Sequence, residues 1–173
     1  MSDTNTNSGD QPAQTPPAMP QMRILGQFVR DLSFENIVAQ TGGGAEMKPN
    51  IKVSVSLDAK KRSIENQYEV VSKYTVTSVA QDSDATLFVI ELEYGAIFHV
   101  ENVPDAQLHP YLLIECPRMV FPYVRRIVSD LTHDGGFPGL NLEPIDFVSL
   151  YRQSLVKKAE AAAAEKAQAP TVN

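Results

Sequence analysis

Cysteine and histidine are the side chains in this sequence that most often carry chemistry. The single cysteine, Cys116, precedes Pro117 at the predicted start of a helix, where the helix dipole can lower the pKa of a thiol. A nucleophilic thiol also needs a base. His99, His109 and His133 form neither an i, i+4 pair nor a cluster with carboxylates at metal-ligand spacing. We therefore interpret Cys116 as a small buried side chain and the histidines as surface or interface residues.

A glycine run and a basic run are the other candidate motifs. Gly42-Gly43-Gly44 could cradle a phosphate, but no Gly-Lys-Ser/Thr follows and no helical pattern begins there, so we predict a mobile loop. Lys60-Lys61-Arg62 is typical of a solvated hairpin turn. The sequence therefore predicts a protein that is not an enzyme and that uses no metal or cofactor.

Length and charge exclude several classes of protein. The chain has 173 residues, enough for one domain, and 15 basic against 21 acidic residues give a net charge of −6. That balance argues against a nucleic-acid partner, and a lone cysteine favours a reducing compartment. The start of the chain lacks a basic and apolar signal, and no run approaches the roughly 18 apolar residues of a membrane span. We expect a cytoplasmic protein without direct membrane insertion.

The two ends differ in composition from the middle. Residues 1–21 are polar and contain four prolines, which predicts a disordered arm. Residues 157–169 are only Ala, Lys, Glu and Gln. They favour helix but have no apolar stripe, so we expect a solvated, frayed tail over 157–173. One domain is left, at residues 22–156.

Alternating side chains predict that strands occupy the first part of this domain. Ile51, Val53, Val55 and Leu57 alternate with polar residues over 51–58. Residues 86–94 also divide into two faces, residues 23–35 are apolar-rich, and residues 68–80 are rich in Val, Tyr and Thr, which suit a pleated surface. Short polar turns join most of these segments. The prediction is a four-stranded antiparallel meander.

A helical period follows after Val100. One apolar stripe is predicted to begin near Cys116-Pro117 and to end at Gly135-Gly136; it contains Met119, Val120, Tyr123, Val124, Ile127, Val128 and Leu131. A second helix is predicted after Pro144, with Asp146 as its N-cap and a stripe of Phe147, Leu150, Tyr151 and Leu155. Strands followed by two main helices indicate an α+β fold. The apolar surplus suggests an oligomer or a protein-binding module.

Several blocks of sequence resemble one family. Residues 136–147 read GFPGLNLEPIDF, which is similar to a Phe-Pro-x-Leu-Asn-Leu-x-Pro run of the bacterial protein-export chaperone family SecB. Further matching blocks follow the family's order: LSFE at 32–35, YEVV at 68–71, TVT at 75–77, GAIF at 95–98, and Cys116-Pro117 with FPY at 121–123. The resemblance covers roughly residues 22–153.

The resemblance implies a homotetramer, a dimer of dimers, that acts as an ATP-independent holdase. Such a chaperone keeps secretory precursors unfolded and delivers them to the translocase motor SecA. A groove of apolar side chains suits this task, because each Å² of apolar area removed from water contributes roughly 25 cal/mol. Several weak sites linked together raise avidity by roughly 10²–10⁴.

The family's functional surfaces map onto particular residues. The client surface maps to Ile51, Val53, Val55, Phe137 and Leu142, each of which is otherwise an ordinary core position. The motor-docking surface maps to Asp31, Glu35, Val89 and Glu91, otherwise a solvated sheet face. The contact between dimers maps to Val124, Ile127, Val128 and Leu131 of the first main helix. The stripe Phe88, Ile90, Leu92 and Tyr94 is interpreted first as core and subunit packing.

Two departures from the family keep alternatives open. The arm at 1–21 is longer than the resemblance explains, and the Ala-rich tail at 161–173 does not match the family's short polar tail that contacts the motor. A SecB-like chaperone of a toxin–antitoxin system is one alternative function. A non-enzymatic oligomeric scaffold or small-ligand binder is the other.

Overall fold

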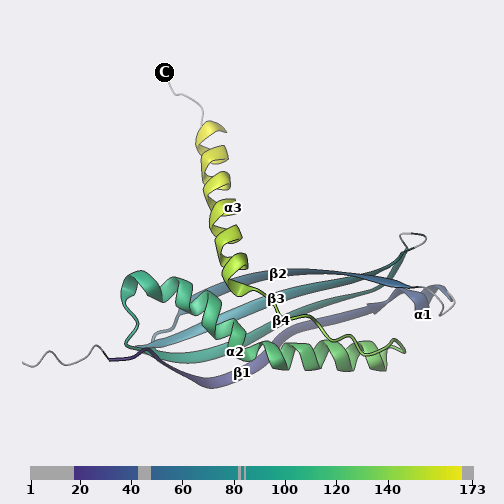
Figure 1. Ribbon diagram of the computed structural model, residues 1–173, viewed down its shortest axis with the longest axis horizontal. Helices are drawn as coiled ribbons and strands as arrows, with labels where there is room; N and C mark the ends of the chain where they lie inside the picture. Colours follow the sequence, from purple (N-terminus) through teal and green to yellow (C-terminus); the bar gives the residue numbers. More distant parts are fainter. Residues whose placement is uncertain (1–17, 43–47, 82, 84, 169–173) are drawn as a thin grey trace, which may run out of the picture.

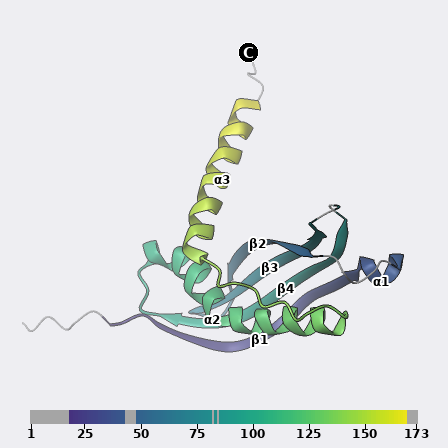
Figure 2. The same cartoon turned by 45° about the vertical axis from the view of Figure 1, so that its right-hand side comes forward.

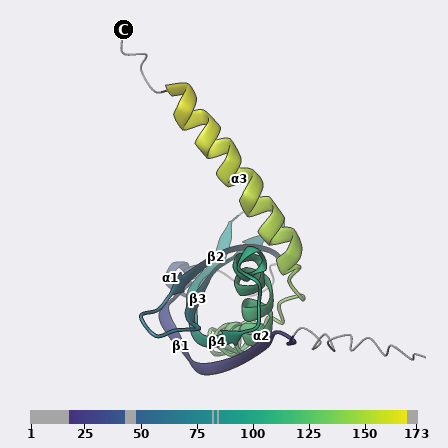
Figure 3. The same cartoon turned by 90° about the vertical axis from the view of Figure 1, so that its left-hand side faces the viewer.

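One curved sheet, covered on one face by a long helix, makes up most of the protein. A computed structural model describes residues 18–42, 48–81, 83 and 85–168. The elements are β1 (Gln21–Asn36), α1 (Ile37–Thr41), β2 (Pro49–Lys61), β3 (Gln67–Ala80), β4 (Thr86–Glu101), α2 (Asp105–Asp134) and α3 (Phe147–Gln168). The sheet curves around α2, and α3 points away from it (Figures 1 and 3). The α+β architecture predicted from the sequence is confirmed.

The strand order differs from a simple meander. All pairs are antiparallel, as predicted, but the order is β1-β4-β3-β2, so only β2, β3 and β4 follow one another. β1 and β4 both have 16 residues and pair along nearly their whole length. The connection from β1 to β2 therefore joins opposite edges of the sheet. It begins with α1, which contacts β4. The alternation of side chains predicts strands but does not reveal which strand lies next to which.

The two faces of the sheet differ in whether a helix covers them. On the face under α2, here called the covered face, the largest fully buried side chains form the core: Tyr74, Val76, Ile90, Leu92 and Phe98. Phe88 and Tyr94 are buried in the same cluster, so the stripe on β4 is core as interpreted. No described helix lies over the opposite face, here called the open face (Figure 2).

Two irregularities in β1 let it follow the curved sheet. Its pairing with β4 shifts between Ile24 and Gly26 and again between Val29 and Asp31, as at β-bulges. After the first shift, Phe28 pairs with Gly95 on the open face. A Cβ atom at Gly95 would lie 2.6 Å from the Phe28 ring, so only glycine leaves room for this aromatic side chain.

The long helix α2 starts earlier than the sequence suggests. It begins at Asp105 and holds Pro110, Pro117 and Pro122 in its interior, so Cys116 is not at the helix start. Cys116 is fully buried, and burial raises the pKa of its thiol to about 12, which supports the interpretation as a packing residue. The predicted end is correct: the Gly135 N–H donates to the Leu131 carbonyl over 2.9 Å. The prediction placed the helix start at Cys116-Pro117 because proline is usual in the first turn of a helix. Here prolines stand in the helix interior, where tertiary packing compensates for the hydrogen bonds that they remove.

Helix α3 continues further than its composition suggests. It begins at Phe147 as predicted and remains helical through Gln168, where we expected fraying. Leu155 does not belong to its packed stripe, since this side chain is 45% exposed while Ser154 is partly buried. No helix in the described part of the chain is long and apolar enough to cross a membrane. Residues 1–17, Gly43 and Gly44, which carry the predicted arm and loop, lie outside the described residues.

Candidate functional site

A groove lies between β2 and the base of α3. It has a volume of about 290 Å³ and is lined by Val55, Ser56, Leu57, Leu113, Leu150, Tyr151, Gln153, Ser154, Lys157 and Lys158. β2 is an edge strand, so the helical layer covers it less completely than the central strands. The apolar side chains on this strand are therefore left at the surface, next to the groove.

The three predicted client-binding residues of β2 form one row. Ile51, Val53 and Val55 pair with Ser78, Val76 and Tyr74, which places all three on the covered face. Val53 is 44% exposed, Ile51 and Val55 are partly buried, and Val55 lines the groove. The row thus presents apolar surface without being sealed in the core.

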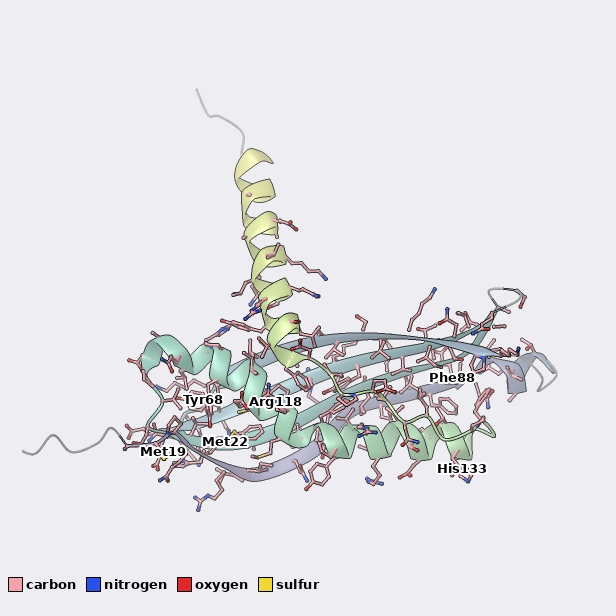
Figure 4. The ribbon with its side chains drawn as sticks, in the orientation of Figure 1. Met19, Met22, Tyr68, Phe88, Arg118 and His133 are labelled. Carbon is pink, nitrogen blue, oxygen red and sulfur yellow. The ribbon has the colours of Figure 1, made fainter. Side chains whose placement is uncertain are left out.

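The two predicted client-binding residues after α2 differ from each other. Phe137 is partly buried, with its ring 4.9 Å from that of Phe88. Phe88 and His133, which lies near the end of α2, are at the same end of the molecule (Figure 4). Leu142 is only 3% exposed and belongs to the core. This burial argues against Leu142 as a contact for clients in the single chain. The apolar spacing alone could not distinguish the two environments.

The segment after α2 is held by a residue that the sequence analysis missed. Thr132 is fully buried; its hydroxyl accepts a bond from the Leu140 N–H (2.8 Å) and lies 2.9 Å from the Val128 carbonyl. The Phe137 N–H also donates to the Thr132 carbonyl over 3.0 Å. The sequence did contain a sign of this role, because Thr132 is a polar residue within an apolar helical stripe and a buried hydroxyl needs hydrogen-bond partners.

The four predicted docking residues are close together on the open face. In the sheet register Glu35 pairs with Val89 and Ser33 with Glu91, so all four side chains project from the adjacent strands β1 and β4. Glu93 pairs with Asp31 and joins them, although the sequence analysis missed it. Its parity with Glu91 on the strand could have revealed it.

Two basic side chains partly balance this acidic patch, which we define as Asp31, Glu35, Glu91 and Glu93. Arg30 donates to Glu93 at 2.8 Å, and Lys73 lies 3.8 Å from both Glu91 and Glu93. Four carboxylates against two cations leave an excess of negative charge. The patch is on the face of the sheet opposite to the groove.

The predicted contact between dimers needs correction. Val124 and Val128 are 0% exposed in the single chain and pack in its own core, while Ile127 and Leu131 are partly buried against it. Val124 and Val128 therefore have no exposed surface with which to contact a second subunit. The stripe found from the sequence is the one that faces the sheet.

A different apolar surface remains exposed on α2 and β1. Met119 and Tyr123 are 46% and 44% exposed on α2, and Val29 and Leu32 are exposed on β1. Val29 pairs with Tyr94, whose pKa is raised by burial and then by the nearby Tyr123. These exposed apolar side chains are a candidate surface for subunit contact.

The histidines lie apart from one another. His99 contacts Glu101 at 2.9 Å, His109 contacts the Tyr151 hydroxyl at 3.1 Å, and His133 is exposed near the end of α2. Among the described residues, no three His, Cys, Asp or Glu side chains are grouped so that they could hold a metal ion.

The start of α3, which forms one wall of the groove, depends on Asp146. Its carboxylate accepts bonds from the Ser149 N–H (3.0 Å) and hydroxyl (2.7 Å), as the predicted N-cap requires. These bonds hold the pKa of Asp146 below its usual value. A group whose pKa is lowered on folding stabilises the fold above its unfolded pKa, and the effect is lost as the pH falls through the folded value.

We therefore expect the start of α3 to loosen in acid. Protection of the Ser149 amide from hydrogen exchange should fall as the pH drops below the ordinary aspartate pKa of 3.8. Asp146→Ala should remove the protection at all pH values. Asp146→Asn keeps a capping oxygen and should retain the protection without the pH dependence. Equal exchange in all three proteins would contradict the capping role.

Comparisons with known proteins agree with this geometry. The family model described as preprotein translocase subunit SecB matches residues 15–158. A relative from Roseobacter denitrificans named protein-export protein SecB is 66% identical over 139 residues, covering 80% of this chain and 84% of the relative. One of the same name from Ruegeria pomeroyi is 55% identical over 166 residues, covering 96% and 98%.

A solved structure shares the fold at much lower identity. A SecB-like chaperone from Mycobacterium tuberculosis, in complex with a peptide from an antitoxin, matches with a TM-score of 0.61 and 16% identity. The match covers 72% of this chain and 90% of that one. Together, the family match over most of the chain and the high identity to the curated relatives show that the chain belongs to the SecB family of protein-export chaperones.

Proposed function

We propose that the protein is an ATP-independent holdase that keeps secretory precursors unfolded and passes them to the motor SecA. The observation that carries the proposal is the row Ile51, Val53 and Val55, an apolar strip left partly exposed beside a groove. An unfolded chain can bury its apolar segments there without sequence-specific bonds. The protein acts by binding alone, in the cytoplasm, and catalyses no reaction.

The acidic patch supports delivery to a basic surface on the motor. Asp31, Glu35 and Glu91 are exposed on the open face, with Val89 partly buried among them. Charges at the rim of an interface steer the encounter and determine which partner fits. A toxin–antitoxin chaperone would have no need of this patch, which is why we favour export.

A homotetramer, as a dimer of dimers, completes the proposal. β1 is an edge strand with unpaired backbone groups on one side and exposed Val29 and Leu32 on the covered face. Edge strands and apolar patches of this kind are typical of subunit interfaces. Assembly would multiply the groove, so that one client is held at several weak sites.

The apolar row gives the test of client binding. Val53→Asp should weaken capture of a denatured precursor by about tenfold or more, because the carboxylate loses hydration when a client covers it. Capture is measured as suppression of precursor aggregation without ATP, at low and at raised salt. Binding to the unmodified protein should largely persist at raised salt, since apolar burial is not screened.

Ser54→Asp is the matched control for this test. It places the same charge one residue further on, on the open face of β2, and should leave capture unchanged. Equal loss in both variants would mean that the added charge, not its place in the apolar row, disturbs binding. Unimpaired capture by Val53→Asp would remove the row from the client site.

A further inference from the structure

A group of apolar side chains lies on the open face of the sheet. Phe28 on β1 pairs with Gly95 on β4, and Gly95 pairs on its other side with Val71 on β3, so the three residues form one row across three strands. Ile97 is two residues from Gly95 on β4 and therefore projects from the same face. We call Phe28, Val71 and Ile97 the open-face apolar patch.

The ring of Phe28 is held against the sheet. A Cβ atom at Gly95 would lie 2.6 Å from Phe28 Cε2, so the ring occupies the space above the glycine. Val71, the next residue in this row, is only 7% exposed although it does not belong to the core cluster. Phe28 itself is 37% exposed. The ring is thus positioned before a partner binds, which lowers the entropy lost when a partner contacts it.

The open-face apolar patch borders the acidic patch. In the neighbouring row of the same face, Glu93 pairs with Asp31 on β1 and with Lys73 on β3. Glu93 and Gly95 are two residues apart on β4, which is about 7 Å along a strand. Arg30 donates to Glu93 at 2.8 Å, so the charge is partly neutralised at the border of the two patches. One face therefore presents an aromatic ring beside an excess of carboxylates.

The place of the open-face apolar patch suits the motor better than a second subunit or a client. Pairing at the β1 edge uses backbone groups in the plane of the sheet, which leaves both faces free. Val29 and Leu32, the exposed β1 residues proposed for subunit contact, are on the covered face, as is the apolar row of β2 proposed for clients. The partner expected on the open face is the one that docks on the acidic patch.

We propose that Phe28 is an aromatic anchor of the motor-docking surface, and that the matching surface of the motor carries an apolar side chain beside its basic residues. This inference rests on the proposed delivery to the motor and extends that site beyond its carboxylates. Buried aromatic side chains supply much of the binding free energy of protein interfaces, whereas charges at the rim mainly steer the encounter. The carboxylates bring the motor to the open face, and Phe28 slows its release.

The test measures the affinity of the full chain for SecA by calorimetry at low and at raised salt. Phe28→Ser should lower the affinity about tenfold at both salt concentrations, because salt does not screen an apolar contact. Phe28→Tyr keeps the ring and should retain most of the affinity. Ile64→Ser is the matched control: it removes a side chain that is 55% exposed in the turn between β2 and β3, and it should leave the affinity unchanged.

A second variant keeps the test decisive if Phe28→Ser folds poorly. Ile97→Thr retains the branched shape that suits a strand and removes part of the open-face apolar patch. It should lower the affinity about threefold, again at both salt concentrations. Thermal unfolding and light scattering on each variant show that the fold and the assembly are retained.

Three results would overturn the inference. If Phe28→Ser and Ile97→Thr bind the motor normally while Asp31→Lys with Glu91→Lys does not, docking depends on the carboxylates alone and the proposed delivery stands. If none of these variants weakens the motor contact, the inference and the delivery step are both wrong. If the two apolar variants impair capture of a denatured precursor or reduce the assembly while motor affinity is kept, the patch serves clients or subunits instead.

Discussion

Replacing Val124 by aspartate is expected to unfold the chain rather than to divide an assembly. The side chain is 0% exposed and packs between α2 and the covered face, so a carboxylate there would be buried without a partner. We expect a loss of at least about 3 kcal/mol, a large part of the roughly 5–15 kcal/mol that stabilises a domain. Loss of far-UV circular dichroism or a sharply lowered Tm would show it.

Tyr123→Asp is the contrasting variant, one residue earlier on the same helix. Its ring is 44% exposed, so the single chain should stay folded while light scattering reports a smaller assembly. Tyr123→Phe keeps the apolar ring and should keep the tetramer. If Val124→Asp gave a folded but smaller assembly, Val124 would belong to the subunit interface after all. If the wild-type protein were a monomer, the proposed tetramer would be wrong.

Reversing two charges of the acidic patch is expected to separate holding from delivery. Asp31→Lys with Glu91→Lys turns attraction for a basic surface into repulsion and opens no cavity, since both side chains are exposed. Affinity for SecA, measured by calorimetry, should fall at least tenfold, which corresponds to roughly 1.4 kcal/mol or more. Raised salt should weaken the wild-type contact in the same direction.

Capture of a denatured precursor by the same double variant should be unchanged, because the patch is on the face opposite to the groove. Glu65→Lys with Asp134→Lys is the matched control; both residues are exposed and lie outside the patch. Unchanged affinity for the motor would remove the acidic patch from the mechanism. Loss of both activities would mean that this face is structural.

Local patterns in the sequence predicted the elements well and their environments less well. Alternation over 51–58 located β2, and Asp146 marked the start of α3, because both signals depend on neighbouring residues. The neighbour of β1 is set by a pairing between residues far apart in the chain, which no local pattern records. The start of α2 was missed because three prolines stand inside a helix that packing stabilises.

The candidate site shows the same division. The resemblance to the SecB family supplied Asp31, Glu35 and Glu91, and strand parity correctly placed Asp31 with Glu35 on one face, because period-two spacing determines which residues share a face. Apolar spacing in the sequence could not tell that Leu142 is buried or that Val124 and Val128 pack in the core of the single chain. Exposure depends on which helix lies over which strand, and that arrangement appears only in three dimensions.

The strand order leaves the protein itself at risk of aggregation, which is the process that it is proposed to prevent in its clients. β2 is a 13-residue strand at the sheet edge, with unpaired backbone groups that could template cross-β growth. Three lysines of this edge strand, Lys52, Lys60 and Lys61, are exposed. Charged side chains on an edge strand commonly protect a protein against edge-to-edge aggregation. When no client is present, the solubility of the protein at high concentration therefore depends on these surface lysines as well as on its core.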